Sequence, residues 1–267
     1  MNPTTNYSGR RDFLRSLAAL AAGLPVASRL AGQTPPPDPS RTIDDLVAAN
    51  RILASQGVFD AYGHVSMRSA QNPQHYFMTR SLASELVSAD DILEFDLDSN
   101  IVGNKKAATF LERFIHGEVY RARADVNSVI HCHTPSLIPF GVTGVPLKPV
   151  FGLAGFIAEG IPVFEIRKGF GMTDLLISDA PRARALVQAL GDKPAALLRG
   201  HGAVIVGPTV PIAVGRAVYL QEDARQQAQA MAMSSTVTYL EPQEGKQSVV
   251  EAYRRAWELW RTKALNK

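Results

Sequence analysis

Short apolar runs bounded by glycine, proline or polar turns recur along the chain and predict the strands of a central sheet. The clearest run is DVNSVIHCHTP at 125–135, where Val126, Val129 and Ile130 are β-branched and Pro135 cannot continue a strand ladder. The same signals predict further strands at 64–68, 75–79, 92–96, 162–166, 195–199 and 203–206. The strand at 75–79 is expected to pair with the strand at 64–68 in an antiparallel way.

Apolar residues at helical spacing predict helices before and between these strands. The first helix is expected to open at 40–45 and to end at Gly57, because glycine suits the left-handed residue that follows a helix. The others are predicted at 109–123, 178–190, 211–233 and 249–263. We therefore expect an α/β fold with a single domain of roughly 235 residues once a targeting segment is removed.

The first 33 residues of the 267-residue chain have the pattern of an export leader. The segment RRDFLR at 10–15 matches the twin-arginine pattern of bacterial export signals, and a weakly apolar run follows at 17–30. That run is too short to span a bilayer, so no stable membrane insertion is expected. We predict a twin-arginine signal peptide at 1–33, a proline-rich linker at 34–41, a domain at 42–267 and a periplasmic location. The alternative is a basic leader that does not direct export.

Composition adds few constraints. The net charge of +3 is small and belongs partly to the leader, so it gives no electrostatic reason to expect a nucleic-acid partner. With 46% hydrophobic and 20% charged residues, the chain is typical of globular proteins that have a sizeable core. The single cysteine, Cys132, excludes an intrachain disulfide.

Two histidines stand at the end of the strand at 125–135. Because side chains alternate along a strand, His131 and His133 share one face and Cys132 lies on the other. Two imidazoles on one face can bind a single metal ion, and a hydrogen-bonded pair of histidines is an equally good interpretation. The GHG segment at 200–202 adds His201 between two apolar strands, where backbone can approach a ligand closely. A plain turn histidine is the alternative there.

Glu112 and His116 are four residues apart on the predicted helix at 109–123 and therefore share a face. The carboxylate has two interpretations. It could be catalytic, or it could form a capping box with Thr109 and only satisfy the start of the helix.

The spacing of these residues resembles the class II aldolase/adducin family. Glu112 precedes the H-x-H pair of His131 and His133 by 19 positions, and His201 follows about 70 residues later. The segments Gly63-x-x-Ser66-x-Arg68 and Glu112-x-x-x-His116-x-x-x-Tyr120-x-x-Arg123-x-Asp125-Val126 support the resemblance, which covers about residues 42–235. It implies a three-layer α/β/α fold with a mostly antiparallel central sheet. It also implies ring-shaped homotetramers with active sites at subunit interfaces.

Carried over by position, the resemblance implies that His131, His133 and His201 bind a divalent transition metal, which could be zinc, manganese, iron or cobalt. Glu112 then takes the place of the acid/base carboxylate. His116 could order Glu112 or a water molecule, and structural packing is an equally good role for it. Adducin-like members without catalysis lack the histidine set, so an enzyme is expected.

The chain departs from the sugar-phosphate aldolases of this family in ways that favour another substrate. Their glycine-asparagine pair becomes Gly63-His64, and their small hydroxyl residues before the glutamate become Phe110-Leu111, which cannot donate hydrogen bonds to phosphate. The segment DAYGHVS at 60–66 is similar to the branch that contains decarboxylases of hydroxylated aromatic or pyridine dicarboxylates.

We therefore expect a metal-dependent carbon–carbon lyase, most simply a decarboxylase of a non-phosphorylated hydroxy- or keto-carboxylate. Glu112 or His64 would move the proton, and Arg80 or an arginine from a neighbouring subunit would pair with the substrate carboxylate. The residues expected to contact this small-molecule substrate are Tyr62, Gly63, Ser66, Arg80 and Ser81. The alternatives are an aldolase that cleaves a hydroxy-carbonyl compound, an iron-dependent oxygenase on the same site, and a binding protein without catalysis.

Overall fold

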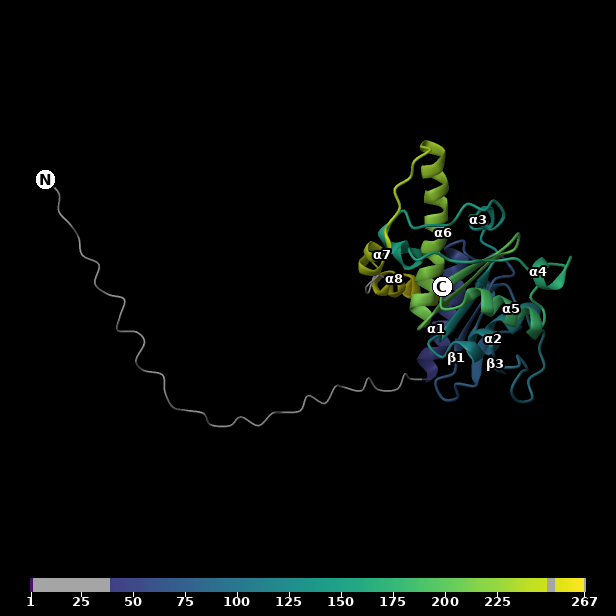
Figure 1. Cartoon of the computed structure of the whole chain (residues 1–267). Coiled ribbons are helices and arrows are strands. Elements are labelled where there is room, and N and C mark those ends of the chain that lie inside the picture. Colours follow the sequence, from purple (N-terminus) through teal and green to yellow (C-terminus); the bar gives the residue numbers. More distant parts are fainter. Residues whose placement is uncertain (2–38, 249–252, 267) are drawn as a thin grey trace, which may run out of the picture. The chain divides into compact units, whose positions relative to one another are not determined.

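The computed structural model describes Met1, residues 39–248 and residues 253–266 (Figure 1). All elements below belong to the unit Pro37–Lys267. The predicted signal peptide and most of the predicted linker lie outside the described residues, and both stay predictions. Within the described ranges, no helix combines the length and the apolar character needed to cross a membrane.

A seven-stranded sheet forms the middle layer, with the strand order β3-β2-β1-β4-β7-β6-β5. Every neighbouring pair is antiparallel except β5 and β6, which run parallel. The prediction of a mostly antiparallel central sheet is confirmed. The strands are β1 (His64–Arg68), β2 (His75–Thr79), β3 (Ile92–Asp96), β4 (Ser128–Cys132), β5 (Val163–Phe164), β6 (Ala195–Leu198) and β7 (Gly202–Gly207).

Helices cover both faces of the sheet, which gives the three layers that the sequence predicts (Figure 1). Helices α1, α6 and α8 pack against one another on one side, and α2 and α5 pack together on the other. The helices are α1 (Pro39–Ser55), α2 (Phe114–Ala122), α3 (Ile138–Val142), α4 (Arg167–Phe170), α5 (Ala180–Leu190), α6 (Val210–Met233), α7 (Pro242–Ser248) and α8 (Arg254–Leu265). Short 3₁₀ turns add η1 (Ser84–Leu86), η2 (Ala89–Asp91), η3 (Leu111–Arg113) and η4 (Gly152–Ile157).

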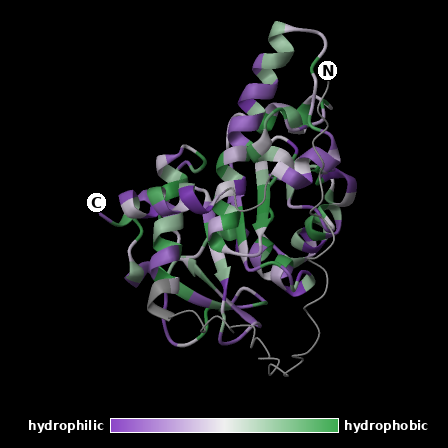
Figure 2. Cartoon of the chain, turned by 90° about the vertical axis from the view of Figure 1, so that its left-hand side faces the viewer, coloured by the Kyte–Doolittle hydropathy of each residue, from purple (hydrophilic) through white to green (hydrophobic). Residues whose placement is uncertain are grey.

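The central strand β4 shows how the apolar pattern separates two cores. Ile130 and Cys132 point into the core that α1 and α6 cover, whereas Val129 points into the core that α2 and α5 cover. All three side chains are fully buried. Figure 2 shows the apolar strands in the middle of the domain. Because the strand period is two, His131 shares the face of Val129, toward α2.

Several predicted boundaries differ from the structure. Helix α1 begins at Pro39, so the last residues of the predicted linker at 34–41 are helical. The helix predicted at 109–123 begins instead with the turn η3, kinks at Glu112 (φ −91°, ψ 16°) and continues as α2. The strand predicted at 162–166 contains only two paired residues, β5.

Candidate metal centre

The histidines of β4 lie in the middle of the sheet. His131 is opposite His64 of β1 on one side and opposite Val204 of β7 on the other. His131 is fully buried, whereas His133, just past the end of β4, is partly exposed. Cys132 points into the opposite core, as the alternation predicts.

The turn between β6 and β7 brings His201 to the same place. Gly200 has a positive φ of 67°, a backbone conformation that glycine adopts without strain. A Cβ at Gly202 would lie 1.9 Å from the carbonyl oxygen of Cys132, so only glycine lets β7 begin this close to β4. The two glycines therefore place the imidazole of His201 beside that of His133.

Glu112 faces the histidines from the kink between η3 and α2. One carboxylate oxygen accepts a hydrogen bond from the backbone N–H of Ile177 at 2.9 Å. The other oxygen lies 3.1 Å from Nε2 of His131 and 3.4 Å from Nε2 of His201. The turn η3 starts at Phe110 without a side-chain cap, so the capping-box interpretation is wrong.

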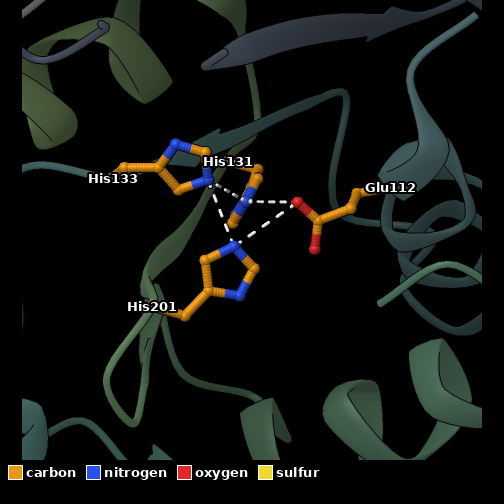
Figure 3. A group of neighbouring side chains, drawn as sticks. All are labelled: Glu112, His131, His133 and His201. Carbon is orange, nitrogen blue, oxygen red and sulfur yellow. Dashed lines mark hydrogen bonds and ion pairs between the residues drawn. The ribbon is translucent and has the colours of Figure 1, made fainter. Parts of the chain in front are cut away.

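The four side chains point at a common centre (Figure 3). The Nε2 atom of His133 lies 3.2 Å from that of His131 and 3.1 Å from that of His201, and the candidate ligand atoms of all four residues are within 4.8 Å of one another. Tetrahedral ligands with bonds of about 2.0–2.1 Å stand about 3.3 Å apart. Four of the six separations, between 3.1 and 3.4 Å, are thus close to this length.

The hydrogen bonds of Nδ1, the ring nitrogen that faces away from the centre, determine whether Nε2 can bind a metal ion. Nδ1 of His131 lies 3.1 Å from the carbonyl oxygen of Ala203, and Nδ1 of His201 lies 3.0 Å from that of Leu175. Nδ1 of His133 lies 3.4 Å from a carboxylate oxygen of Asp60. Carbonyl and carboxylate oxygens only accept, so each Nδ1 carries a proton, and in the neutral form of each ring Nε2 has a bare lone pair.

Three nitrogen lone pairs and a carboxylate that converge in this way repel one another unless a cation joins them. Burial alone would raise the pKa of Glu112, but positive charge at the position of His131 and His201, on a proton or on a bound cation, holds it well below its usual range, so the carboxylate is ionised. Burial and the two neighbouring imidazoles lower the pKa of His133, which favours the neutral form that ligates metals. The donor set fits a divalent cation.

A cavity of about 590 Å³ opens beside the four residues. Its wall combines aromatic and aliphatic surface with hydroxyl and imidazole groups. It is lined by Tyr62, His64, Ser81, Thr109, Phe110, Leu111, Glu112, His133, Leu176, Gly200 and His201. Tyr62 is 70% exposed at its mouth. The cavity is therefore large enough for a small aromatic or aliphatic acid.

The structure places four of the predicted substrate-contacting or catalytic residues in this wall, namely Tyr62, His64, Ser81 and Glu112. Gly63 lies behind the wall, where its N–H donates to Asp60 and a Cβ would lie 2.3 Å from the ring of Phe59. Its role is to allow close backbone packing.

Two predicted substrate contacts do not reach the cavity, and one predicted positioning role changes. The Arg80 guanidinium donates to Asp91 at 2.7 Å, so its charge is already paired. Ser66 is fully buried, and its hydroxyl lies 2.6 Å from Nδ1 of His116. His116 bonds to His64 and Ser66 through its two ring nitrogens, and neither nitrogen bonds to Glu112.

The sequence did not reveal the groups that orient the site. Asp60 stands in the DAYGHVS segment, but its position beside His133 depends on a contact 73 residues away. The carbonyl groups of Leu175 and Ala203 and the N–H of Ile177 are backbone atoms, for which no residue type is a signal.

Comparison with known proteins agrees with this geometry. Residues 44–228 match the sequence model of the Class II Aldolase and Adducin N-terminal domain. The protein belongs to the class II aldolase/adducin family. It is an enzyme of the lyase type, with a fold and a possible histidine–glutamate metal site that suit this family.

Similar curated proteins of this family carry the name decarboxylase. The chain is 31% identical to "Decarboxylase tropJ" of Talaromyces stipitatus over 80% of its length and 90% of that protein. It is also 31% identical to a "3,4-dihydroxyphthalate decarboxylase" of Arthrobacter keyseri over 65% of its length and 72% of that protein. Among solved structures, an L-fuculose 1-phosphate aldolase from Glaciozyma antarctica PI12 has the same fold, with a TM-score of 0.68 and 21% identity over 87% of this chain and 92% of that one.

Proposed function

We propose that this member of the family is a metal-dependent decarboxylase of a non-phosphorylated hydroxy- or keto-carboxylate, with an aromatic acid as the favoured class. The observation that carries the proposal is the convergence of three Nε2 atoms and one carboxylate beside the cavity. His131, His133 and His201 would hold the divalent ion. When bound, such an ion supplies a Lewis acid that stabilises an anionic substrate oxygen.

The wall of the cavity supports an aromatic acid over a sugar phosphate. Phe110 and Leu111 stand beside Glu112, with Tyr62 at the mouth, and these apolar surfaces suit a ring. Within the described residues, neither arginine nor lysine lines the cavity. A phosphate group would gain little from such a wall, whereas a carboxylate that must leave as carbon dioxide needs no cation to hold it.

Glu112 is the group that can move the proton. Its ionised carboxylate is held in place by the Ile177 N–H and can accept the proton of the substrate hydroxyl. It then returns a proton to the ring carbon that carries the carboxylate. The bond between that carbon and the carboxylate breaks, carbon dioxide leaves, and the electron pair flows back to the substrate oxygen, which is reprotonated from water.

The proposal is tested with the metal-loaded protein and a panel of hydroxybenzoates and hydroxypyridine carboxylates, with carbon dioxide release as the readout. The change Glu112→Gln keeps the size of the side chain but removes the base, so we expect turnover to fall by at least about 100-fold. The matched control is Glu118→Gln, because Glu118 is an equally buried glutamate that pairs with Arg184 away from the cavity.

Other outcomes would point to the rival activities. Release of two carbonyl-containing fragments without carbon dioxide would indicate an aldolase. Oxygen uptake with an iron-loaded protein would indicate an oxygenase. Full activity of Glu112→Gln would contradict the assigned role of the carboxylate.

A further inference from the structure

A chain of buried polar side chains leads from the cavity into the protein between β1 and α2. Nδ1 of His64 lies 2.7 Å from Nε2 of His116, and Nδ1 of His116 lies 2.6 Å from the hydroxyl of Ser66. That hydroxyl lies 2.7 Å from the hydroxyl of Tyr120. None of the four side chains is more than 2% exposed, and only His64 borders the cavity.

The inner end of this chain fixes the direction of its hydrogen bonds. Among the described residues, the only acceptor for the Tyr120 hydroxyl is the oxygen of Ser66. The backbone N–H of Val129 approaches the same phenol oxygen, and the guanidinium of Arg68 lies over the ring at 4.7 Å. These neighbours are a donor and a cation, so neither can accept the phenol proton. Tyr120 therefore donates to Ser66.

This donation also fixes the donor in the hydrogen bonds from Ser66 to His116 and from His116 to His64. Ser66 has a single proton and, since it accepts from Tyr120, it donates to Nδ1 of His116. His116 then carries its proton on Nε2 and donates to Nδ1 of His64. His64 in turn carries its proton on Nε2. The reverse order would leave the buried Tyr120 hydroxyl without an acceptor, which costs the desolvation of that group.

The inner histidine stays neutral in this environment. Burial, together with a smaller effect of the nearby His131, lowers the pKa of His116 to about 3. The ring therefore keeps one proton, and its position follows from the bonds described above.

We propose that His116, Ser66 and Tyr120 are positioning residues that hold His64 as a neutral donor, with its Nε2–H directed into the cavity toward the substrate oxygen on which negative charge develops. Nε2 of His64 has no hydrogen-bond partner within the described residues, and its ring lies 5.2 Å from that of His131 and 4.6 Å from that of Phe110. The donor thus stands beside the candidate metal ligands, where it can share the stabilisation of an oxyanion. The identity of that oxygen rests on the proposed decarboxylase function.

The tautomer of His64 is measured directly by long-range ¹H–¹⁵N correlation of the zinc-loaded protein labelled with ¹⁵N-histidine, with His64→Gln used to assign the signals. We expect a protonated Nε2 and an unprotonated Nδ1 for His64, and the same pattern for His116. A protonated Nδ1 on His64 would overturn the proposal.

Two variants test the positioning role. Tyr120→Phe removes only the hydroxyl that sets the direction, and Ser66→Ala breaks the chain. We expect both to give His64 a mixed tautomer and to lower kcat by about ten-fold with KM within two-fold, less than the loss of a whole oxyanion donor. The matched control is Tyr76→Phe, because Tyr76 is a fully buried tyrosine that stacks on His116 but directs its hydroxyl to Ser99.

The outcomes separate this inference from the proposed function. Variants that keep the His64 tautomer and the kcat of the unmodified protein would overturn the positioning role. An equal decrease in kcat in Tyr76→Phe and Tyr120→Phe would also overturn the positioning role, because a general change in packing would then explain the decrease. The expected tautomer in a protein that releases no carbon dioxide from any acid of the panel would support the buried chain and contradict the decarboxylase.

Discussion

At the scale of single residues, the proton positions on the histidines decide what the site can bind. Three acceptors outside the centre, Ala203, Leu175 and Asp60, fix the Nδ1 protons and leave Nε2 free. His64 has the opposite arrangement, since its Nδ1 accepts from His116. Three of these histidines are therefore candidate metal ligands, whereas His64 is a candidate hydrogen-bond donor.

The carboxylate behind His133 gives a residue-scale prediction about metal affinity. Asp60→Asn keeps an oxygen for the N–H groups of Tyr62 and Gly63 but removes the negative charge next to His133. Loss of such an outer partner weakens metal binding by about 10-fold or more. Titration with a fluorescent zinc chelator measures this. Asp98→Asn is the control, since the exposed Asp98 pairs with Arg121, and equal affinities in both variants would contradict the role of Asp60.

A second residue-scale prediction concerns stability and pH. Asp223 is buried on α6, where one carboxyl oxygen accepts from the N–H of Val150 and the other has no partner among the described residues. Burial raises its pKa to about 7. In the unfolded chain an aspartate ionises near about pH 3.9. Between these values the unfolded state loses its proton first, so stability falls as the pH rises through this window.

Asp223→Asn has no carboxyl group to ionise, so it removes this pH-dependent loss of folding stability. We expect the variant to unfold like the unmodified protein near pH 4 and to be more stable above pH 7, by at most about 4 kcal/mol. Urea unfolding at several pH values measures the difference, with the exposed Asp192→Asn as the control. Parallel stability curves for Asp223→Asn and the unmodified protein would show that Asp223 is ionised in the fold.

The resemblance to the class II aldolase/adducin family predicted the convergence of Glu112, His131, His133 and His201. Strand alternation, a local feature, placed only His131 and His133 on one face. The contacts of Arg80 and Ser66 were not predictable in this way. Asp91 and His116 reach them through the folded chain, and no local pattern shows whether a polar side chain already has a partner.

At the scale of elements, the site depends on the close pairing of β4 with β7. Cys132 pairs with Ala203 where the strands meet, and Gly202 lies against the Cys132 carbonyl. This pairing sets the distance between the H-x-H pair and His201.

Gly202→Ala is therefore expected to force the two strands apart. Its Cβ would lie 1.9 Å from backbone oxygen, so we expect a loss of stability of at least about 2 kcal/mol and a loss of metal binding. Gly169→Ala is the control, because no atom lies within 4 Å of the added Cβ. Thermal unfolding and metal titration compare the two. A Gly202→Ala protein with unchanged stability would contradict the tight packing of β7 on β4.

The elements that the sequence missed lack an apolar signal. Helix α7 (PQEGKQS) is polar, and it packs through Gly245, where a Cβ would lie 2.4 Å from the carbonyl oxygen of Gly155. Contact between two glycine backbones leaves no hydrophobic pattern. The kink at Glu112 was also missed, because the carboxylate that holds it bonds to Ile177, 65 residues away. The strands were predicted well because their apolar runs are short and clearly bounded.

At the scale of the whole molecule, the candidate centre joins parts of the chain that are far apart in sequence. Glu112 comes from the kink before α2, His131 and His133 from the end of β4, and His201 from the turn between β6 and β7. A cation bound at this centre would stabilise the folded state, since the unfolded chain has no such site. Export by the twin-arginine route, periplasmic location and assembly as a homotetramer stay predictions from the sequence and the family.

The most direct test of the account is the metal content of the folded protein, compared with that of a His131→Ala/His133→Ala variant. We expect about one transition-metal ion per chain in the unmodified protein and none in the variant, since two of the three imidazole ligands are gone. Purification must avoid chelators, and circular dichroism must show that the variant is folded. The absence of bound metal in the unmodified protein would contradict the metal centre.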